Sequence, residues 1–146
     1  DLPIVTLSRE VSSGTYTYFK EEVVHLGKKD SVEEFPSDTL LLSSSQAIVE
    51  EVVTNPAAIG YLGMGYVSER TKSLNLGRGG TQFYPPNIDN ILKKTYPLSR
   101  GLYFYTNGQP EGITKLFIDF TLGAKGQQQF IDTGFVPLGA NVAKKD

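Results

Sequence analysis

The residues best suited to chemistry in this sequence lie close together near its start. Arg9, Ser13, Gly14 and Thr15 form the pattern R-x-x-x-S-G-T, which separates an apolar stretch from an amphipathic one. A guanidinium can hold two oxygens of an oxyanion at once, and hydroxyl groups donate further hydrogen bonds. Gly14 has no Cβ, so the backbone there can approach a ligand closely. The pattern therefore predicts reversible binding of a tetrahedral oxyanion.

The elements expected on either side of this pattern favour the same chemistry. Residues 2–7 predict a short buried strand, residues 8–15 a polar turn, and residues 15–25 a helix that Gly27 ends. The first backbone N–H groups of a helix have no intrahelical partner, and the helix dipole places partial positive charge beside them. A helix that begins directly behind Gly14 would therefore offer a site for an anion.

The same residues also fit a purely structural interpretation. In that case Ser13 or Thr15 caps a helix and Gly14 forms a turn. Arg9 then pairs with Glu10 or with another acid at the surface. Short motifs often match by chance, so the spacing alone leaves both interpretations open.

The composition excludes several other kinds of site. The 146 residues contain no cysteine and one histidine, His25, which argues against disulfides, thiolate or histidine metal sites and catalytic triads. The net charge of -2 creates no field that would attract nucleic acid. We therefore predict no catalytic residues, no metal ligands, no cofactor and no nucleic-acid partner.

The rest of the chain alternates between strand-like and helix-like segments. The expected strands are residues 39–42, 58–67 (a central strand followed by a turn), 72–76 and 101–106. The expected helical segments are residues 46–54, a segment that begins after a cap at Asn87 and is ended by Tyr96-Pro97, and residues 112–122 and 126–132. This alternation predicts an α/β fold with a largely parallel or mixed sheet, and the length suits a single domain.

Further polar residues are candidates for a secondary role at the same site. The serines at residues 43–45 are expected to cap the helix at residues 46–54. If that helix faces the same cleft, Ser44 and Ser45 are secondary ligands, and Glu10 and Ser12 are secondary candidates within the first motif. The glycine-rich residues 77–80 lack the Lys-Ser/Thr of a phosphate loop, and we interpret them as a hairpin turn.

Four blocks of the sequence resemble, in the same order, the PstS-like phosphate-binding proteins of phosphate ABC transporters. The first block is residues 3–15, PIVTLSREVSSGT. The others are residues 55–67 (NPAAIGYLGMGYV), 96–106 (YPLSRGLYFYT) and 117–138 (FIDFTLGAKGQQQFIDTGFVPL). Two positions depart from the family's pattern: Val11 stands where an acidic residue is common, and Gly101 stands where proline is usual.

The resemblance implies both a fold and a set of ligand contacts. The fold would be a single three-layer α/β lobe of a type II periplasmic binding protein, with a mixed, mostly parallel sheet flanked by helices. The contacts to phosphate, or to sulfate in its place, would come from Arg9, Ser13, Gly14 and Thr15, and Glu10 would orient Arg9. No chemistry on the anion is implied.

The resemblance also sets expectations for the protein's context. Members of that family are longer, two-lobed bacterial receptors, secreted or membrane-anchored, that are periplasmic or extracellular and deliver phosphate to the membrane permease of the transporter. Residues 1–146 would then be one partial domain, the second lobe and closing segments without the N-terminal lobe. A homo-oligomer or domain swap could complete the half site. The alternative is a structural or interaction module, oligomerising or signalling, with a vestigial anion site.

Overall fold

The computed structural model describes residues 2–139, and the chain divides into two compact units, Asp1–Lys72 and Ser73–Asp146. The first unit contains strands and helices in alternation, and in the second the regular elements are helices. The prediction that residues 1–146 form one partial domain stays a prediction. Among the residues described, no helix is long and apolar enough to cross a membrane.

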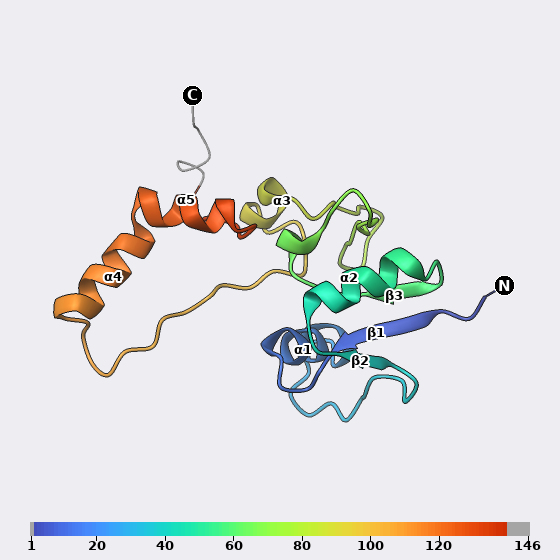
Figure 1. The fold of residues 1–146 in the computed structure, drawn as a ribbon. Helices are drawn as coiled ribbons and strands as arrows, with labels where there is room; N and C mark the ends of the chain where they lie inside the picture. The colour runs from blue at the N-terminus through green and yellow to red at the C-terminus, as the bar shows by residue number, and fades with distance from the viewer. Residues whose placement is uncertain (1, 140–146) are drawn as a thin grey trace. The chain divides into compact units, whose positions relative to one another are not determined.

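The first unit is built on a small parallel sheet (Figure 1). The strand β1 (Val5–Arg9) lies between β2 (Leu40–Leu42) and β3 (Ala58–Gly60), and both pairings are parallel. The register places Arg9 opposite Leu42, the last residue of each strand. Because parallel strands point the same way, the chain leaves β1 and β2 at the same edge of the sheet.

Helical segments connect these strands, as parallel pairing requires. The helix α1 (Gly14–Phe19) continues directly into the π-helical segment η1 (Lys20–Val24), and both lie between β1 and β2 in the sequence. Gly27, at φ 72°, follows this segment and confirms the predicted helix end. The helix α2 (Ser45–Thr54) connects β2 to β3.

A few apolar side chains form the centre of the first unit. Leu7 of β1 is 3% exposed, and Ile48 and Val49 of α2 are 0% and 5% exposed. A Cβ added at Gly60 would lie 2.7 Å from Cγ2 of Ile48, so the missing side chain there lets α2 pack closely on the sheet. This packing fixes the start of α2 relative to the end of β1.

Aromatic rings join α1 to the same unit. The rings of Phe19 and Tyr61 stack with centroids 3.8 Å apart and an interplanar angle of 5°. Phe35, in the loop before β2, stacks against both of these rings and makes a tilted contact with Tyr16. Stacked aromatic pairs stabilise a fold beyond the area that they bury. The cluster therefore holds α1 against the segment that follows β3.

Up to residue 139, the second unit contains three helices: α3 (Ile88–Leu92), α4 (Gly112–Leu122) and α5 (Ala124–Asp132). The last two pack together around Gly126, where a Cβ would lie 2.6 Å from the Cα of Thr121. The buried amide of Gln127 donates to the carbonyl oxygen of Thr121 at 2.8 Å. The three helices confirm the expected segments, but α5 starts two residues earlier than predicted and α3 ends at Leu92, before the predicted end at Tyr96-Pro97.

The structure confirms the α/β class and the parallel sheet flanked by helices, and it corrects three predicted strands. The segment at residues 58–67 is not central: its strand, β3, is three residues long and lies at the sheet edge, before the 3-10 helix η2 (Met64–Tyr66). Residues 72–76 contribute one isolated bridge, Leu76 to Tyr84, and residues 101–106 are irregular. Residues 72–76 and 101–106 have strand-like composition, but a strand also needs a neighbouring strand to which its backbone can hydrogen-bond. Within residues 2–139 neither segment pairs with a strand, apart from that one bridge.

Candidate anion-binding site

The predicted motif lies at the carboxyl end of the parallel sheet, where β1 and β2 end. This end of the sheet is called the sheet edge below. Arg9 is the last residue of β1, and the N–H of Glu10 donates to the carbonyl oxygen of Leu42 at 3.1 Å. Both strands then turn directly into helix starts, α1 after Ser13 and α2 after Ser44. In open parallel sheets, ligands bind in the crevice outside the carboxyl ends of the strands.

The Arg9 guanidinium is held across the start of α2. Its Nη1 donates to Oγ of Ser45 at 3.1 Å, and its Nη2 donates to the carbonyl oxygen of Ser43 at 3.1 Å. Its Nε lies buried and has no hydrogen-bond partner among the described residues. A buried N–H without an acceptor costs about 1–3 kcal/mol. Arg9 is thus fixed in place with unused hydrogen-bonding capacity.

The start of α1 has the cap that the sequence predicts. Ser13 adopts an extended backbone (φ -77°, ψ 128°), and its Oγ accepts a hydrogen bond from the N–H of Thr15 at 3.2 Å. The N–H of Ser13 donates to the carbonyl oxygen of Glu10 at 2.9 Å, which closes the turn. Gly14 is exposed and Ser13 half-buried, so the turn is open to solvent. The first turn of α1 can therefore offer N–H groups to an anion.

The start of α2 is also capped by serine. Oγ of Ser44 accepts a hydrogen bond from the N–H of Ala47 at 3.0 Å, and this confirms the predicted cap. Ser45 is the first residue of the helix and is 7% exposed, with its hydroxyl directed to Arg9. The hydroxyl of Ser44 therefore caps the helix, and the hydroxyl of Ser45 accepts a hydrogen bond from the guanidinium of Arg9.

The hydroxyls of Ser8, which is buried, and Tyr61, which is half-buried, form a pair next to the backbone of Arg9. Oγ of Ser8, which is 0% exposed, lies 2.6 Å from the phenol oxygen of Tyr61 and donates to the carbonyl oxygen of Arg9 at 3.1 Å. Burial raises the pKa of Tyr61 above its ordinary value, and the hydrogen bond to Ser8 opposes this. The phenol therefore stays neutral through the physiological range.

The structure brings some of the predicted residues together and leaves others apart. Arg9 meets Ser45 directly, but no hydrogen bond joins its guanidinium to Ser13, Gly14 or Thr15 among the described residues. Within residues 2–139 the carboxylate of Glu10 forms no ion pair with Arg9, and the serines after β2 orient the guanidinium instead. Ser12 is exposed on the turn. The roles of all these residues toward a ligand stay predictions.

Sequence reasoning missed three participants: the carbonyl oxygen of Ser43, and the pair of Ser8 and Tyr61. A signal for Ser43 was present, because a serine run follows the second apolar strand and parallel strands bring their ends together. Nothing in the local pattern links Ser8 to Tyr61, which is 53 positions away.

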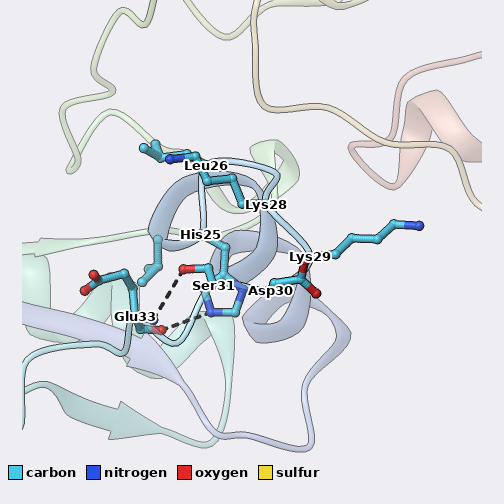
Figure 2. Close-up of a pocket in the computed structure, with 8 residues that line it drawn as sticks. His25, Leu26, Lys28, Lys29, Asp30, Ser31 and Glu33 are labelled. Carbon is cyan, nitrogen blue, oxygen red and sulfur yellow. Dashed lines mark hydrogen bonds between the residues drawn. The ribbon is translucent and has the colours of Figure 1, made fainter.

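Two hollows of the described surface lie away from this motif. One, of about 740 Å³, is lined by the end of η1 and the loop after it (Figure 2). Its His25 is already bonded, with Nε2 lying 3.0 Å from the carbonyl oxygen of Glu33. A second, of about 520 Å³, lies in the other unit beside Arg78 and Lys94. The first hollow is lined by charges of both signs, and the charged lining residues of the second are the cations Arg78 and Lys94. The site where β1 and β2 end differs from both because it combines a fixed cation with two helix starts.

The chemistry available at the sheet edge is hydrogen bonding to an anion. It supplies one guanidinium, the hydroxyls of Ser13 and Thr15, and the amides of the first turn of α1. Residues 2–139 contain no cluster of three or more His, Cys, Asp or Glu side chains that could hold a metal ion.

The chain matches known proteins over most of its length. The model of the PBP superfamily domain matches residues 1–125. The phosphate-binding protein PstS of Pseudomonas aeruginosa is 36% identical over 98% of this chain, which covers 44% of that relative. The phosphate-binding protein PstS of Borreliella burgdorferi is 29% identical over 94% of this chain, which covers 50% of it. The chain therefore spans about half the length of the curated relatives that it matches.

Solved structures of proteins with similar names also resemble this chain. An ABC-type phosphate transport receptor from Vibrio cholerae matches with a TM-score of 0.72 and 28% identity, over 93% of this chain and 53% of the receptor. A putative phosphate ABC transporter substrate-binding protein with bound phosphate, from Clostridium perfringens, matches with a TM-score of 0.71 and 28% identity. That match covers 95% of this chain and 54% of the other protein.

Proposed function

The chain belongs to the PBP superfamily, and from this premise we propose that it forms part of a phosphate receptor and binds inorganic phosphate reversibly at its candidate anion-binding site. The relatives and solved structures that it resembles are named as phosphate-binding proteins. None of these names supports the alternative of a structural module. The proposal concerns binding alone, with no reaction on the anion.

The observation that carries the proposal is the state of Arg9. Its guanidinium is fixed at the sheet edge by Ser43 and Ser45, while its Nε–H has no acceptor. An oxyanion that accepted this hydrogen bond would recover about 1–3 kcal/mol of desolvation cost.

Each element of the site has a distinct role in this binding. Arg9 neutralises charge and offers a planar fork of donors. The hydroxyls of Ser13 and Thr15 donate hydrogen bonds, and the exposed backbone at Gly14 lets the first amides of α1 approach the anion. The hydroxyl of Ser13 can accept from the N–H of Thr15 as a cap and donate its O–H to the anion at the same time.

The proposal extends to the protein's setting. A receptor of this kind collects phosphate outside the cytoplasm, in the periplasm or at the cell surface, and passes it to the membrane permease of an ABC transporter. This chain spans about half the length of its relatives. In this proposal the described residues supply one side of the site. We expect weak binding by the chain alone, and stronger binding when a second lobe or a second copy closes the site.

Isothermal titration of the chain with phosphate and with sulfate tests the proposal. We expect binding of both anions, and loss of about 10–100-fold in affinity on Arg9→Ala, because a hydrogen bond to a charged group contributes about 1.5–3 kcal/mol. Phosphate differs from sulfate by its proton, and the nearest acceptor in sequence, Glu10, is exposed. A preference for phosphate above about a hundredfold, or affinity unchanged by Arg9→Ala, would contradict this account.

A further inference from the structure

The hydroxyl of Ser45 touches the one cation of the candidate site, and this contact suggests a role different from ligand binding. We propose that Ser45 is a positioning residue: with the carbonyl oxygen of Ser43, it holds the Arg9 guanidinium in place and acts on the anion through Arg9. This inference rests on the proposed function. It adds a residue that fixes how the cation is presented.

Ser45 is a rigid anchor. It is the first residue of α2, is 7% exposed, and follows the Ser44 cap. Ile48, one turn along the same helix, is fully buried against the sheet. The hydroxyl of Ser45 is therefore fixed by the helix start, and it accepts from Nη1 of Arg9 at 3.1 Å.

The contact between Ser45 and Arg9 also removes rotamer entropy from the free site. Arginine has a long side chain with much rotamer freedom, and ordering it during binding weakens affinity. Two hydrogen bonds to one helix start define the plane of the guanidinium before any ligand arrives. The strand register contributes, because Arg9 lies opposite Leu42, the residue before the serine run. The site is thus preorganised by groups that need not touch the anion.

The charge of the two groups that hold Arg9 also favours anion binding. Both are neutral, a hydroxyl and a carbonyl, and in the described part of the chain Arg9 forms no ion pair with a carboxylate. A carboxylate in the same place would fix the guanidinium equally well but cancel its charge toward a ligand. Neutral anchors leave the full charge available to an anion.

The test compares Ser45→Ala, Ser45→Thr and Ser45→Asp in NMR titrations with inorganic phosphate. Ser45→Ala should weaken binding about three- to tenfold, which is the cost of ordering one long side chain. Ser45→Thr keeps the hydroxyl and should restore most of the affinity. Ser45→Asp should weaken binding by charge cancellation although Arg9 stays ordered.

A matched control separates positioning from stability. Oγ1 of Thr39 bonds Oγ1 of Thr6 at 2.9 Å, before the start of β2 and away from the motif. Thr39→Val removes one hydroxyl contact from the same unit, and should lower stability without changing phosphate affinity. If Thr39→Val weakens binding as much as Ser45→Ala does, general stability explains the effect and the positioning role is refuted.

Two further measurements decide the mechanism. In an Arg9→Ala background, Ser45→Ala should change the phosphate affinity little, because its target is gone; an equal loss in both backgrounds would mean that Ser45 acts independently of Arg9. Without phosphate, the Arg9 Nε–H resonance should report an ordered side chain in the parent and a mobile one in Ser45→Ala. Unchanged order refutes the positioning role, whereas an ordered Arg9 with no phosphate binding refutes only the proposed function.

Discussion

Removal of the Tyr61 hydroxyl tests the support behind Arg9. The phenol oxygen lies 2.6 Å from Oγ of Ser8, a residue that is 0% exposed. Tyr61→Phe keeps the ring that stacks on Phe19 at 3.8 Å and deletes only the hydrogen bond. Ser8 keeps its contact with the carbonyl oxygen of Arg9, so it is left partly satisfied.

The expected loss follows from that arrangement. A buried polar group left without a partner costs about 1–3 kcal/mol. Because Ser8 keeps one hydrogen bond, we expect Tyr61→Phe to lower the free energy of unfolding by about 1–2 kcal/mol, the lower half of that range. Removing both groups in Ser8→Ala/Tyr61→Phe should cost less than the sum of the single changes, since neither orphan remains. Amide hydrogen exchange of β1 measures the local free energy of opening.

The control is another tyrosine hydroxyl with an exposed contact. The phenol of Tyr84 donates to Oε1 of Gln82 at 2.7 Å at the surface, so Tyr84→Phe should change stability by less than about 0.5 kcal/mol. If Tyr61→Phe costs no more than Tyr84→Phe, or if its effect adds to that of Ser8→Ala without coupling, the buried pair does not support the end of β1.

Three other outcomes are expected. Gly60→Ala should lower stability by about 1–3 kcal/mol in urea unfolding, because its Cβ would lie 2.7 Å from Cγ2 of Ile48; no loss would refute the close packing of α2. Ser44→Ala should cost about 1 kcal/mol by removing the cap of Ala47, again in urea, and a neutral effect would contradict the cap. Burial raises the pKa of Tyr61 in the folded state above its unfolded value near 10. The stability that the neutral phenol contributes is therefore fully present below the unfolded pKa and is lost as the pH rises through the folded pKa. Tyr61→Phe should reduce this alkaline loss of stability, and an unchanged pH profile of stability would contradict the prediction.

The sequence predicted the local features of the site because they depend on neighbouring residues. Ser13 before a helix and the serines before α2 are capping signals that act within one turn, and the structure has both caps. The parallel sheet followed from the alternation of strand-like and helix-like segments. Features that depend on residues within one helical turn can therefore be predicted from the sequence.

The contacts of Arg9 could not be predicted in the same way. Glu10 was one expected partner, but it follows the end of β1, is exposed, and forms no ion pair with Arg9 within residues 2–139. Ser43 and Ser45 meet the guanidinium because the register pairs Arg9 with Leu42, 33 positions away. The irregular residues 101–106 show the opposite error, since strand-like composition does not provide a strand to pair with.

The central claim is that an anion binds where β1 and β2 end. Its most direct test is a nitrogen-proton NMR titration of the chain with inorganic phosphate, following the amides of Gly14 and Thr15 and the Nε–H of Arg9. We predict saturable shifts of all three signals at the same phosphate concentration. Shifts confined to the hollow beside Arg78 and Lys94, or no shift at Arg9, would contradict the account.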